Sequence, residues 1–588
     1  MRAIRLFCAV LFAGMLISAI VPAASGASPS RPFAGYGHPS LEAIDAAYQA
    51  GEIDRSEALL YRAYFIFSPD QLPERFALPG PAIKDATGIL LEIQEELDGL
   101  PSDIQGKIQR LLVRPTLPDQ LQTAHFIVHY DAGMHAQAYV ENVAQACEDA
   151  WTKYHTDLGW DVPPSDGAIG GGLGMIDCYI HALSSGILGM AQTESPAPGG
   201  APNDYTGYFH VSEAIGDQEL RMVTVAHEYM HIVQYGHVRS GEITWWMENC
   251  AMRGEEWVYD TYNEYLPYMP PFFQTRYNWI ETYDGTYEYS QIAWPMYFCE
   301  RFDPDAVRAI WYEQKWSPTG SFWAACNEVL APYGYDGNEA YLEFMRWCYY
   351  TGSRDDGNHF EEGSTWATLP TDRTVLAYPS GEKHPRTDRR PEGMGASVNQ
   401  FRPEDSDNIL QVIVDGPNTT LGSDLIQSFP SGMCIEYSMS IDETGYGVIE
   451  IPMFDECTNV IMLTSMGRGV GETGQDFAFW ADCRSDASGV AELRSGEKIR
   501  IHPNHPNPFR LTTAIGYSLE AAADVTVRIL DLNGRVVRHL YAAGQRPGNY
   551  EITWNRADDA GRLVGGGVYF AVLTVGGEER TRQMTVLP

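Results

Sequence analysis

Apolar positions recur three and four residues apart over much of the first 350 residues, a spacing that predicts amphipathic helices. In the stretch "SLEAIDAAYQAGEIDRSEALLYRAYFIF" the pattern begins at a serine that can cap a helix. We interpret residues 28–120 as a helical N-terminal region or a pro-segment. The same spacing predicts further helices at residues 137–160, 218–238, 245–264, 289–302, 304–315, 320–332 and 338–351.

Short apolar runs alternate with these helices from Thr123 onward and predict β-strands. Three such runs are "AHFIVHYD", "MIDCYIHAL" and "YTGYFHVSEA". Residues 184–204 lie between the last two runs, are rich in glycine and proline, and predict a loop. Residues 121–385 are therefore expected to form one domain, in which a strand-rich lobe is followed by a helical lobe.

Helical spacing fades after about residue 385, where short alternating or apolar runs take over. These runs, "NILQVIVDG", "CIEYSMSID", "GYGVIEIPM" and "NVIMLTSM", predict an antiparallel β-sandwich over residues 386–485. A polar linker follows, and residues 501–588 are again expected to be all β. The chain is thus predicted to be a multidomain α+β protein that ends in two all-β sandwich domains.

The charge balance narrows the range of partners. The chain has 78 acidic and 40 basic residues, a net charge of -38, so phosphate backbones would be repelled and nucleic acid is not an expected partner. Such a composition suits a solvated, secreted protein. It is also compatible with bound Ca²⁺, although the sequence contains no complete calcium-binding loop.

The N-terminus has the features of a secretory signal peptide, which we assign to residues 1–26. Arg2 and Arg5 precede an apolar run, and small residues follow in "PAASGAS". No other stretch of the sequence is apolar enough to span a membrane, so a secreted or cell-surface location is expected. Cleavage would leave nine cysteines, of which two among Cys434, Cys457 and Cys483 could pair. No CxxC pair occurs, so a thiolate zinc site is not expected.

The stretch "TVAHEYMHIVQYGH" contains the strongest candidate chemistry of the chain. In "HEYMH", His227 and His231 are four residues apart, which places both imidazoles on one face of a helix, about 40° apart around its axis. Glu228 lies beside them, where it can reach a metal-bound water. Zn²⁺ lowers the pKa of such a water toward neutrality, so Glu228 would remove its proton.

Three residues are candidates for the third protein ligand. His237 would give a pattern close to that of metzincins, but those need glycine where this chain has Gln234, since the helix must turn back there. Glu248 is favoured, because the distance from His231 leaves room for a turn and an antiparallel second helix. Glu255 is two turns further along that helix, and is expected to accept a hydrogen bond from a ligand histidine or to be the ligand itself.

The stretch "WWMENCA" resembles the W-x-x-E-x-x-A segment that carries the glutamate ligand in gluzincins, the thermolysin and aminopeptidase group, although Asn249 stands where glycine is usual. "AHEYMHIVQ" and "WVYDTYNEYLPYM" also resemble a family of secreted bacterial metalloproteases, over roughly residues 40–350. The resemblance implies a thermolysin-like domain with one catalytic Zn²⁺. It further implies that Tyr289, in "YEYSQIAWPMYFCERFD", donates to the oxyanion. Strand 205–211 would be the edge strand that pairs with the substrate.

The last block of the chain resembles a second family. "HPNHPNPFRLTTAIGYSL", "VTVRILDLNGRVVRHL" and "GNYEITWNRADDAGRLVGGGVYFAVLTV" resemble the Ig-like domain related to the flagellar hook cap and the sorting tails of type IX secretion. The resemblance covers residues 501–588. It implies export by an outer-membrane secretion machinery or attachment to the cell surface.

The expected function is therefore that of a secreted zinc metallopeptidase acting on protein or peptide substrates. His227, His231 and Glu248 would hold Zn²⁺, with Glu228 as general base and Tyr289 as oxyanion donor. No GAMEN-like segment is present, which favours an endopeptidase over an aminopeptidase. The alternatives are a surface adhesin that keeps the peptidase fold only for binding, and a latent zymogen in which residues 28–120 cover the cleft.

Overall fold

The computed structural model describes most of the chain from Gly37 to Val586. The predicted signal peptide, residues 1–26, lies outside the described residues. The undescribed residues are 1–36, 168, 172–173, 198–203, 241–242, 318–320, 404–406, 418–420, 443, 472, 485–498, 502–503, 505–508, 520–522, 533, 546–547 and 587–588.

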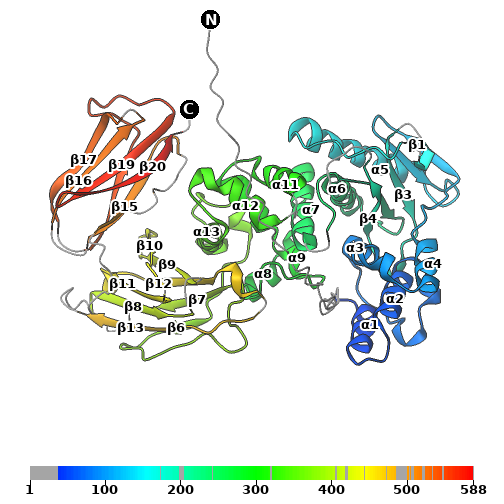
Figure 1. Cartoon of the computed structure of the whole chain (residues 1–588), viewed down its shortest axis with the longest axis horizontal. Coiled ribbons are helices and arrows are strands. Elements are labelled where there is room, and N and C mark those ends of the chain that lie inside the picture. Colours follow the sequence, from blue (N-terminus) through cyan, green and yellow to red (C-terminus); the bar gives the residue numbers. More distant parts are fainter. Residues whose placement is uncertain are drawn as a thin grey trace, which may run out of the picture.

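The described chain begins with a small helical domain, shown in blue in Figure 1. Its second helix starts with a capping box, in which Asp54 and Glu57 satisfy the free amides of the first turn. The helices bury a hydrophobic core of their own, which also takes in Ile187 and Met190 of the next domain. The domain consists of α1 (Pro39–Gln49), α2 (Arg55–Phe67), α3 (Thr87–Glu96) and α4 (Ser102–Leu111).

A mixed five-stranded sheet follows, with strand order β1-β2-β3-β5-β4. Helices α5 (Gln137–Trp151) and α6 (Gln218–Tyr235) pack together and against the sheet, while α3 of the helical domain contacts β4. The strands β2, β3 and β5 are parallel neighbours, and β4 pairs antiparallel with β5. The strands are β1 (Asp119–Gln122), β2 (Phe126–Tyr130), β3 (Ile176–His181), β4 (Gly189–Pro196) and β5 (Tyr205–Ser212).

Strand β4 corrects two expectations from the sequence. Residues 184–204 were expected to be a loop, yet β4 runs through them because β5 supplies the pairing that the segment's own sequence does not signal. Strand β5 lies inside the sheet, so the segment 205–211 is not the edge strand. The edge nearest to α6 is β4 instead.

The helical lobe after the sheet is close to its sequence prediction, with one break. The single helix expected at 289–302 is two helices, because the ring of Pro295 would clash with the carbonyl of Gln291 in a continuous helix. The helices are α7 (Thr244–Tyr259), α8 (Pro270–Thr275), α9 (Tyr287–Ser290), α10 (Ala293–Arg301), α11 (Ala306–Trp316), α12 (Phe322–Leu330) and α13 (Gly337–Tyr349).

Two all-β regions complete the chain (Figure 1). In the first, sheets β10-β9-β12-β7-β6 and β11-β8-β13 share one hydrophobic core, as a β-sandwich requires. Its strands are β6 (Arg373–Val375), β7 (Ala396–Phe401), β8 (Ile409–Asp415), β9 (Leu421–Ser428), β10 (Cys434–Ser438), β11 (Tyr446–Ile451), β12 (Asn459–Met466) and β13 (Ala478–Arg484).

The second β region has its own sheets, β14-β15-β18 and β17-β16-β19-β20, with apolar clusters between strands of both. The multidomain architecture with a C-terminal β region is therefore confirmed. Its strands are β14 (Ile499–Ile501), β15 (Thr513–Leu519), β16 (Ala523–Asp531), β17 (Val536–Gln545), β18 (Gly548–Trp554), β19 (Gly567–Val575) and β20 (Glu578–Val586).

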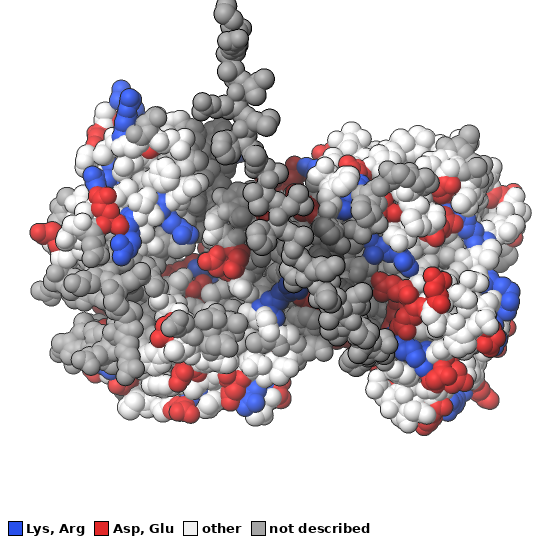
Figure 2. Space-filling model, viewed as in Figure 1, with Lys and Arg blue, Asp and Glu red and all other residues white. Residues whose placement is uncertain are grey.

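On the face shown in Figure 2, acidic side chains occur on all parts of the molecule with basic side chains among them. All nine described cysteines are free, so Cys434, Cys457 and Cys483 do not pair as the sequence had allowed. Within the part of the chain that is described, no helix is both long and apolar enough to cross a bilayer.

Candidate metal centre

Helix α6 carries the two candidate ligand histidines into the interior. Asp217 caps its first turn by accepting a hydrogen bond from the amide of Leu220 at 2.9 Å. Almost every residue of the helix after this turn is buried between the sheet and α7. His227 and His231 therefore point into protein and not into solvent, with 1% and 0% of their surface exposed.

Helix α7 runs antiparallel to α6, as the sequence predicted. Gln234 donates to the carbonyl of Met247 at the end of α6, whereas His227 meets Glu255 near its middle. The two backbones approach closely at Gly254, where an added Cβ would lie 3.3 Å from Cβ of Met230. This close approach brings carboxylates of α7 within reach of imidazoles on α6.

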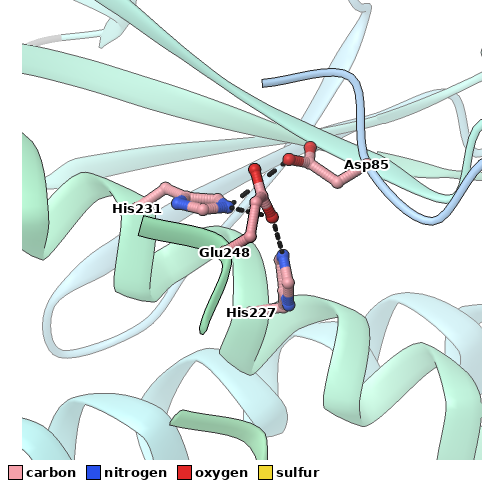
Figure 3. Close-up of side chains that lie close together, drawn as sticks. All are labelled: Asp85, His227, His231 and Glu248. Carbon is pink, nitrogen blue, oxygen red and sulfur yellow. Dashed lines mark hydrogen bonds and ion pairs between the residues drawn. The ribbon is translucent and has the colours of Figure 1, made fainter. Parts of the chain in front are cut away.

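Four side chains meet at this point (Figure 3). Oε2 of Glu248 lies 3.2 Å from Nε2 of His227 and 3.5 Å from Nε2 of His231. Oδ2 of Asp85 lies 3.4 Å from Nε2 of His231. One donor atom from each of the four lies within 4.8 Å of the others. The structure thus brings together the three expected ligands and adds Asp85 from the helical N-terminal domain.

A hydrogen bond from Nδ1 orients the imidazole ring of each histidine. Nδ1 of His227 donates to Oε1 of Glu255 at 2.6 Å, as expected for a carboxylate that supports a ligand. Nδ1 of His231 donates to Oε1 of Gln234 at 2.8 Å. In the neutral form of each ring these contacts place the proton on Nδ1. Nε2, which is directed at Glu248, is then the nitrogen that can bind a metal ion.

The donor set fits a divalent cation. Among the described residues, Nε2 of His231, Oε1 of Glu248 and Oδ2 of Asp85 are buried polar atoms without a hydrogen-bond partner. Burying such groups is costly unless something binds them. Two imidazoles with one or two carboxylates form a ligand set that suits Zn²⁺. Lys84 pairs with Glu255 and offsets only part of the buried negative charge here.

The environment shifts the pKa values of the two histidines in opposite directions. Burial lowers the pKa of His227 to about 4, although the neighbouring Glu248 opposes this. For His231 burial also lowers the pKa, but the carboxylates of Glu248 and Asp85 outweigh it and raise the pKa well above its usual value.

Glu228 lies beside this cluster and is not part of it. Its carboxylate is fully buried, and Oε2 lies 3.5 Å from the hydroxyl oxygen of Thr87. Burial raises its pKa well above the usual value, and the negative charge of Asp85 adds to the effect. Gly189 at the start of β4 leaves room for it, since an added Cβ there would lie 2.2 Å from Oε1 of Glu228.

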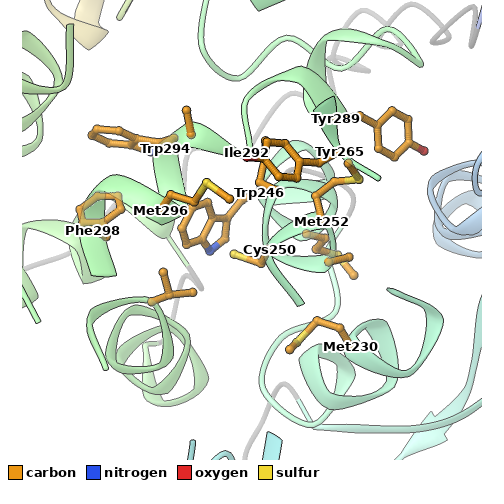
Figure 4. Close-up of a cluster of buried hydrophobic side chains, with 14 of the residues drawn as sticks. Met230, Trp246, Cys250, Met252, Tyr265, Tyr289, Ile292, Trp294, Met296 and Phe298 are labelled. Carbon is orange, nitrogen blue, oxygen red and sulfur yellow. The ribbon is translucent and has the colours of Figure 1, made fainter. Parts of the chain in front are cut away.

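Tyr289 is next to the cluster, on the short helix α9. Its ring centroid is 6.3 Å from that of His227, and its hydroxyl points away from the other labelled side chains of the apolar cluster in Figure 4. Asn249 links α7 to α9 by donating to the carbonyls of Trp245 and Glu288. The residue that departs from the gluzincin pattern thus helps to position the tyrosine.

His237 is not part of the cluster. Its Nδ1 donates to the carbonyl of Val233 at 3.0 Å, and its ring packs against Trp160. The sequence analysis missed two residues, Asp85 and Gln234. Gln234 could have been found, because three residues after His231 is one turn along the same helix face. Asp85 carries no signal in the sequence, because only tertiary packing brings it here.

A large cavity lies elsewhere in the described chain. It has a volume of about 1550 Å³ and is lined by α13, the first β-sandwich and part of the last β region. Two of its charged lining residues, Arg346 and Asp424, form an ion pair at 3.1 Å. None of the four clustered side chains lines it, so the candidate metal centre and this cavity are separate sites.

Comparison with known proteins adds a family for one domain. The family of the FlgD Ig-like domain matches residues 511–577. No curated protein matches the chain. Among solved structures, the chain is similar to PorZ of Porphyromonas gingivalis, an essential surface component of its type IX secretion system. The sequence identity is 20% and the TM-score is 0.12. The match covers 21% of this chain and 14% of PorZ.

Latent PorU of Porphyromonas gingivalis is a second similar structure. It has 16% identity and a TM-score of 0.16, with 30% of this chain and 18% of PorU covered. The chain thus spans less than a fifth of each of these proteins, and similarity at this level establishes no shared fold for the whole chain. The match to the FlgD Ig-like domain, over residues 511–577, falls within the Ig-like domain predicted at 501–588.

Proposed function

We propose that the chain is a secreted, zinc-dependent metallopeptidase of gluzincin type. The observation that carries the proposal is the orientation of the two histidines. Glu255 and Gln234 hold their Nδ1 atoms, and both Nε2 atoms converge on one carboxylate oxygen of Glu248. Buried imidazoles fixed in this way are typical of a metal site.

His227, His231 and Glu248 would hold the metal ion. Zn²⁺ bound there would supply Lewis-acid activation of water and of a peptide carbonyl. Oε1 of Glu228 has no hydrogen-bond partner among the described residues, so it is available to take a proton from the attacking water. The same carboxyl would then pass the proton to the leaving amine.

Two further features would place the substrate. The hydroxyl of Tyr289 would donate a hydrogen bond to the carbonyl oxygen as negative charge develops there. Strand β4 is at the edge of the sheet beside α6, where an extended peptide could add as a further strand. With the five-stranded sheet on one side and α7 to α13 on the other, the domain would be of thermolysin type and would act as an endopeptidase.

The C-terminal domain would direct the enzyme to its place of action. The FlgD Ig-like domain at residues 511–577 and the apolar N-terminal run support export, and we propose passage through an outer-membrane secretion machinery of type IX. The protein would then act outside the cell or at its surface, on protein or peptide substrates.

The test compares the zinc-loaded chain with its Glu228→Gln variant in casein hydrolysis. The variant should keep its zinc and lose roughly 10²–10⁴-fold in activity, the range for a general acid–base residue. Zinc content is measured on the same samples by atomic absorption. Equal activity of the two proteins would rule out the mechanism, because Glu228 would then not act as the general base.

A further inference from the structure

The segment Ile83–Thr87, which leads into α3, lies against the free edge of β4. The amide of Leu188 donates to the carbonyl of Ile83 at 3.0 Å, and the amide of Ala86 donates to the carbonyl of Gly189 at 3.2 Å. Asp85 and Gly189 form a parallel bridge. The segment therefore occupies backbone amide and carbonyl groups at the edge of β4, beside Glu228. An extended peptide substrate would need the same groups in order to pair with this strand.

The side chain of Asp85 is fixed in its direction. Its Oδ1 accepts hydrogen bonds from the amide of Thr87 at 2.9 Å and from the hydroxyl of Thr87 at 2.7 Å. Its Oδ2 is then left facing Nε2 of His231 at 3.4 Å, with no hydrogen-bond partner among the described residues. A carboxylate held by one oxygen and free at the other is prepared to bind a cation.

Lys84 anchors the same segment to α7 and to the loop after it. Its ammonium lies 3.1 Å from Oε1 of Glu255 and 2.5 Å from Oε2 of Glu264, and it stacks over the ring of Tyr268. Glu255 also orients His227 through a hydrogen bond. The segment therefore contacts the carboxylate that orients one proposed ligand, through Lys84, and another proposed ligand directly, through Asp85.

The consequence is that the site is closed. His231 and Glu248 are fully buried, and only 1% of the surface of Asp85 is exposed. A catalytic zinc site keeps one position open for water or substrate, whereas four protein ligands are typical of a site that performs no reaction. With Asp85 as a fourth ligand, a site with an open position would become a closed one.

We propose that Asp85 occupies the metal's open position, and that the Ile83–Thr87 segment keeps the peptidase latent by lying along β4 where substrate would bind. The inference rests on the proposed function for its biological meaning, but the occupation of the metal by Asp85 can be tested by itself. Displacing the N-terminal helical domain would expose the metal and the edge of β4 together. Residues 77–82, exposed and without regular structure immediately before the segment, offer a place where its tether could be cut.

The test measures binding of acetohydroxamate, a small chelator that needs an open position on the metal. Binding to the zinc-loaded full chain is followed by calorimetry in the wild type, in Asp85→Asn and in Asp70→Asn. Asp70 is an exposed acid of the same helical domain and serves as the matched control. Asp85→Asn should bind at least about tenfold more tightly, since apparent affinity scales with the fraction of molecules whose site is open. The wild type and Asp70→Asn should bind equally weakly.

Two results would overturn the proposal. In one, the wild type binds acetohydroxamate as tightly as Asp85→Asn does. In the other, both Asp85→Asn and Asp85→Ala lose their zinc, which would make Asp85 a permanent ligand of a closed structural site.

Casein hydrolysis by the same proteins separates the two proposals. Faster hydrolysis by Asp85→Asn than by the wild type would support both of them. An Asp85→Asn variant that binds acetohydroxamate but cleaves no casein would support the closure by Asp85 and count against the peptidase.

Discussion

Oε1 of Glu255 lies 2.6 Å from Nδ1 of His227, and both side chains are buried. The distance is that of a strong, charge-assisted hydrogen bond, which fixes both the tautomer and the rotation of the ring. Glu255 is in turn paired with Lys84 from the N-terminal domain. The side chain therefore connects a proposed metal ligand to the segment that closes the site.

Glu255→Gln is expected to lower zinc affinity by about 10–100-fold, the usual effect of losing a carboxylate that orients a ligand histidine. The amide is neutral, so it orients the imidazole less well and makes it a poorer donor to the metal. Competition with a chromophoric chelator measures the affinity. The exposed Asp260→Asn at the end of the same helix is the control, and an equal affinity in both variants would assign Glu255 a purely structural role.

Glu248 and His237 were rival third ligands, and their replacements should behave differently. Glu248→Ala should lose most of its zinc, because Oε2 of Glu248 is the atom on which both imidazoles converge. His237→Gln should keep its zinc, because the imidazole of His237 is engaged with the carbonyl of Val233. Zinc content after dialysis distinguishes them. Loss of zinc from His237→Gln alone would restore the metzincin-like interpretation.

Gly189→Ala should impair the reaction without removing the metal. The new Cβ would lie 2.2 Å from Oε1 of Glu228, so the carboxylate must move, and misplacement by about 1 Å can cost about 10²-fold in rate. The measurement is kcat for casein in the Asp85→Asn background, with zinc content beside it. Gly216→Ala is the control, since a Cβ there meets nothing within 4 Å. Equal kcat values would show that Glu228 tolerates the displacement.

The central part of the site could be predicted from the sequence because it lies on two long helices. Periodic apolar positions define α6 and α7, and the four-residue spacing of His227 and His231 fixes a shared face. An antiparallel pair joined by a short turn then brings Glu248 to both imidazoles. The apolar pattern of each helix and the short connection between them were therefore sufficient to predict that His227, His231 and Glu248 lie together.

The rest of the site depends on contacts between segments that are remote in sequence. Strand β4 has a weak strand pattern and forms because β5 pairs with it on one side. Asp85 follows a proline-rich stretch that favours no regular structure, and it reaches His231 only because the helical domain docks on β4. The sequence could suggest that residues 28–120 cover a cleft, but not which residue would close it.

Stability should fall as the pH drops below 6.5, in part because of His237. Its side chain is 1% exposed, and burial lowers its pKa to about 4 in the folded chain, against 6.5 for an unperturbed histidine. Between these values the unfolded state binds the extra proton, so the contribution of His237 is fully present above pH 6.5 and is lost as the pH falls toward 4. The slope is about 1 kcal/mol per pH unit, close to the limit for one proton. Urea unfolding at pH 6.5, 5.5 and 4.5 should therefore show a shallower loss in His237→Gln than in the wild type. Parallel curves for the two proteins would mean that His237 becomes protonated without unfolding.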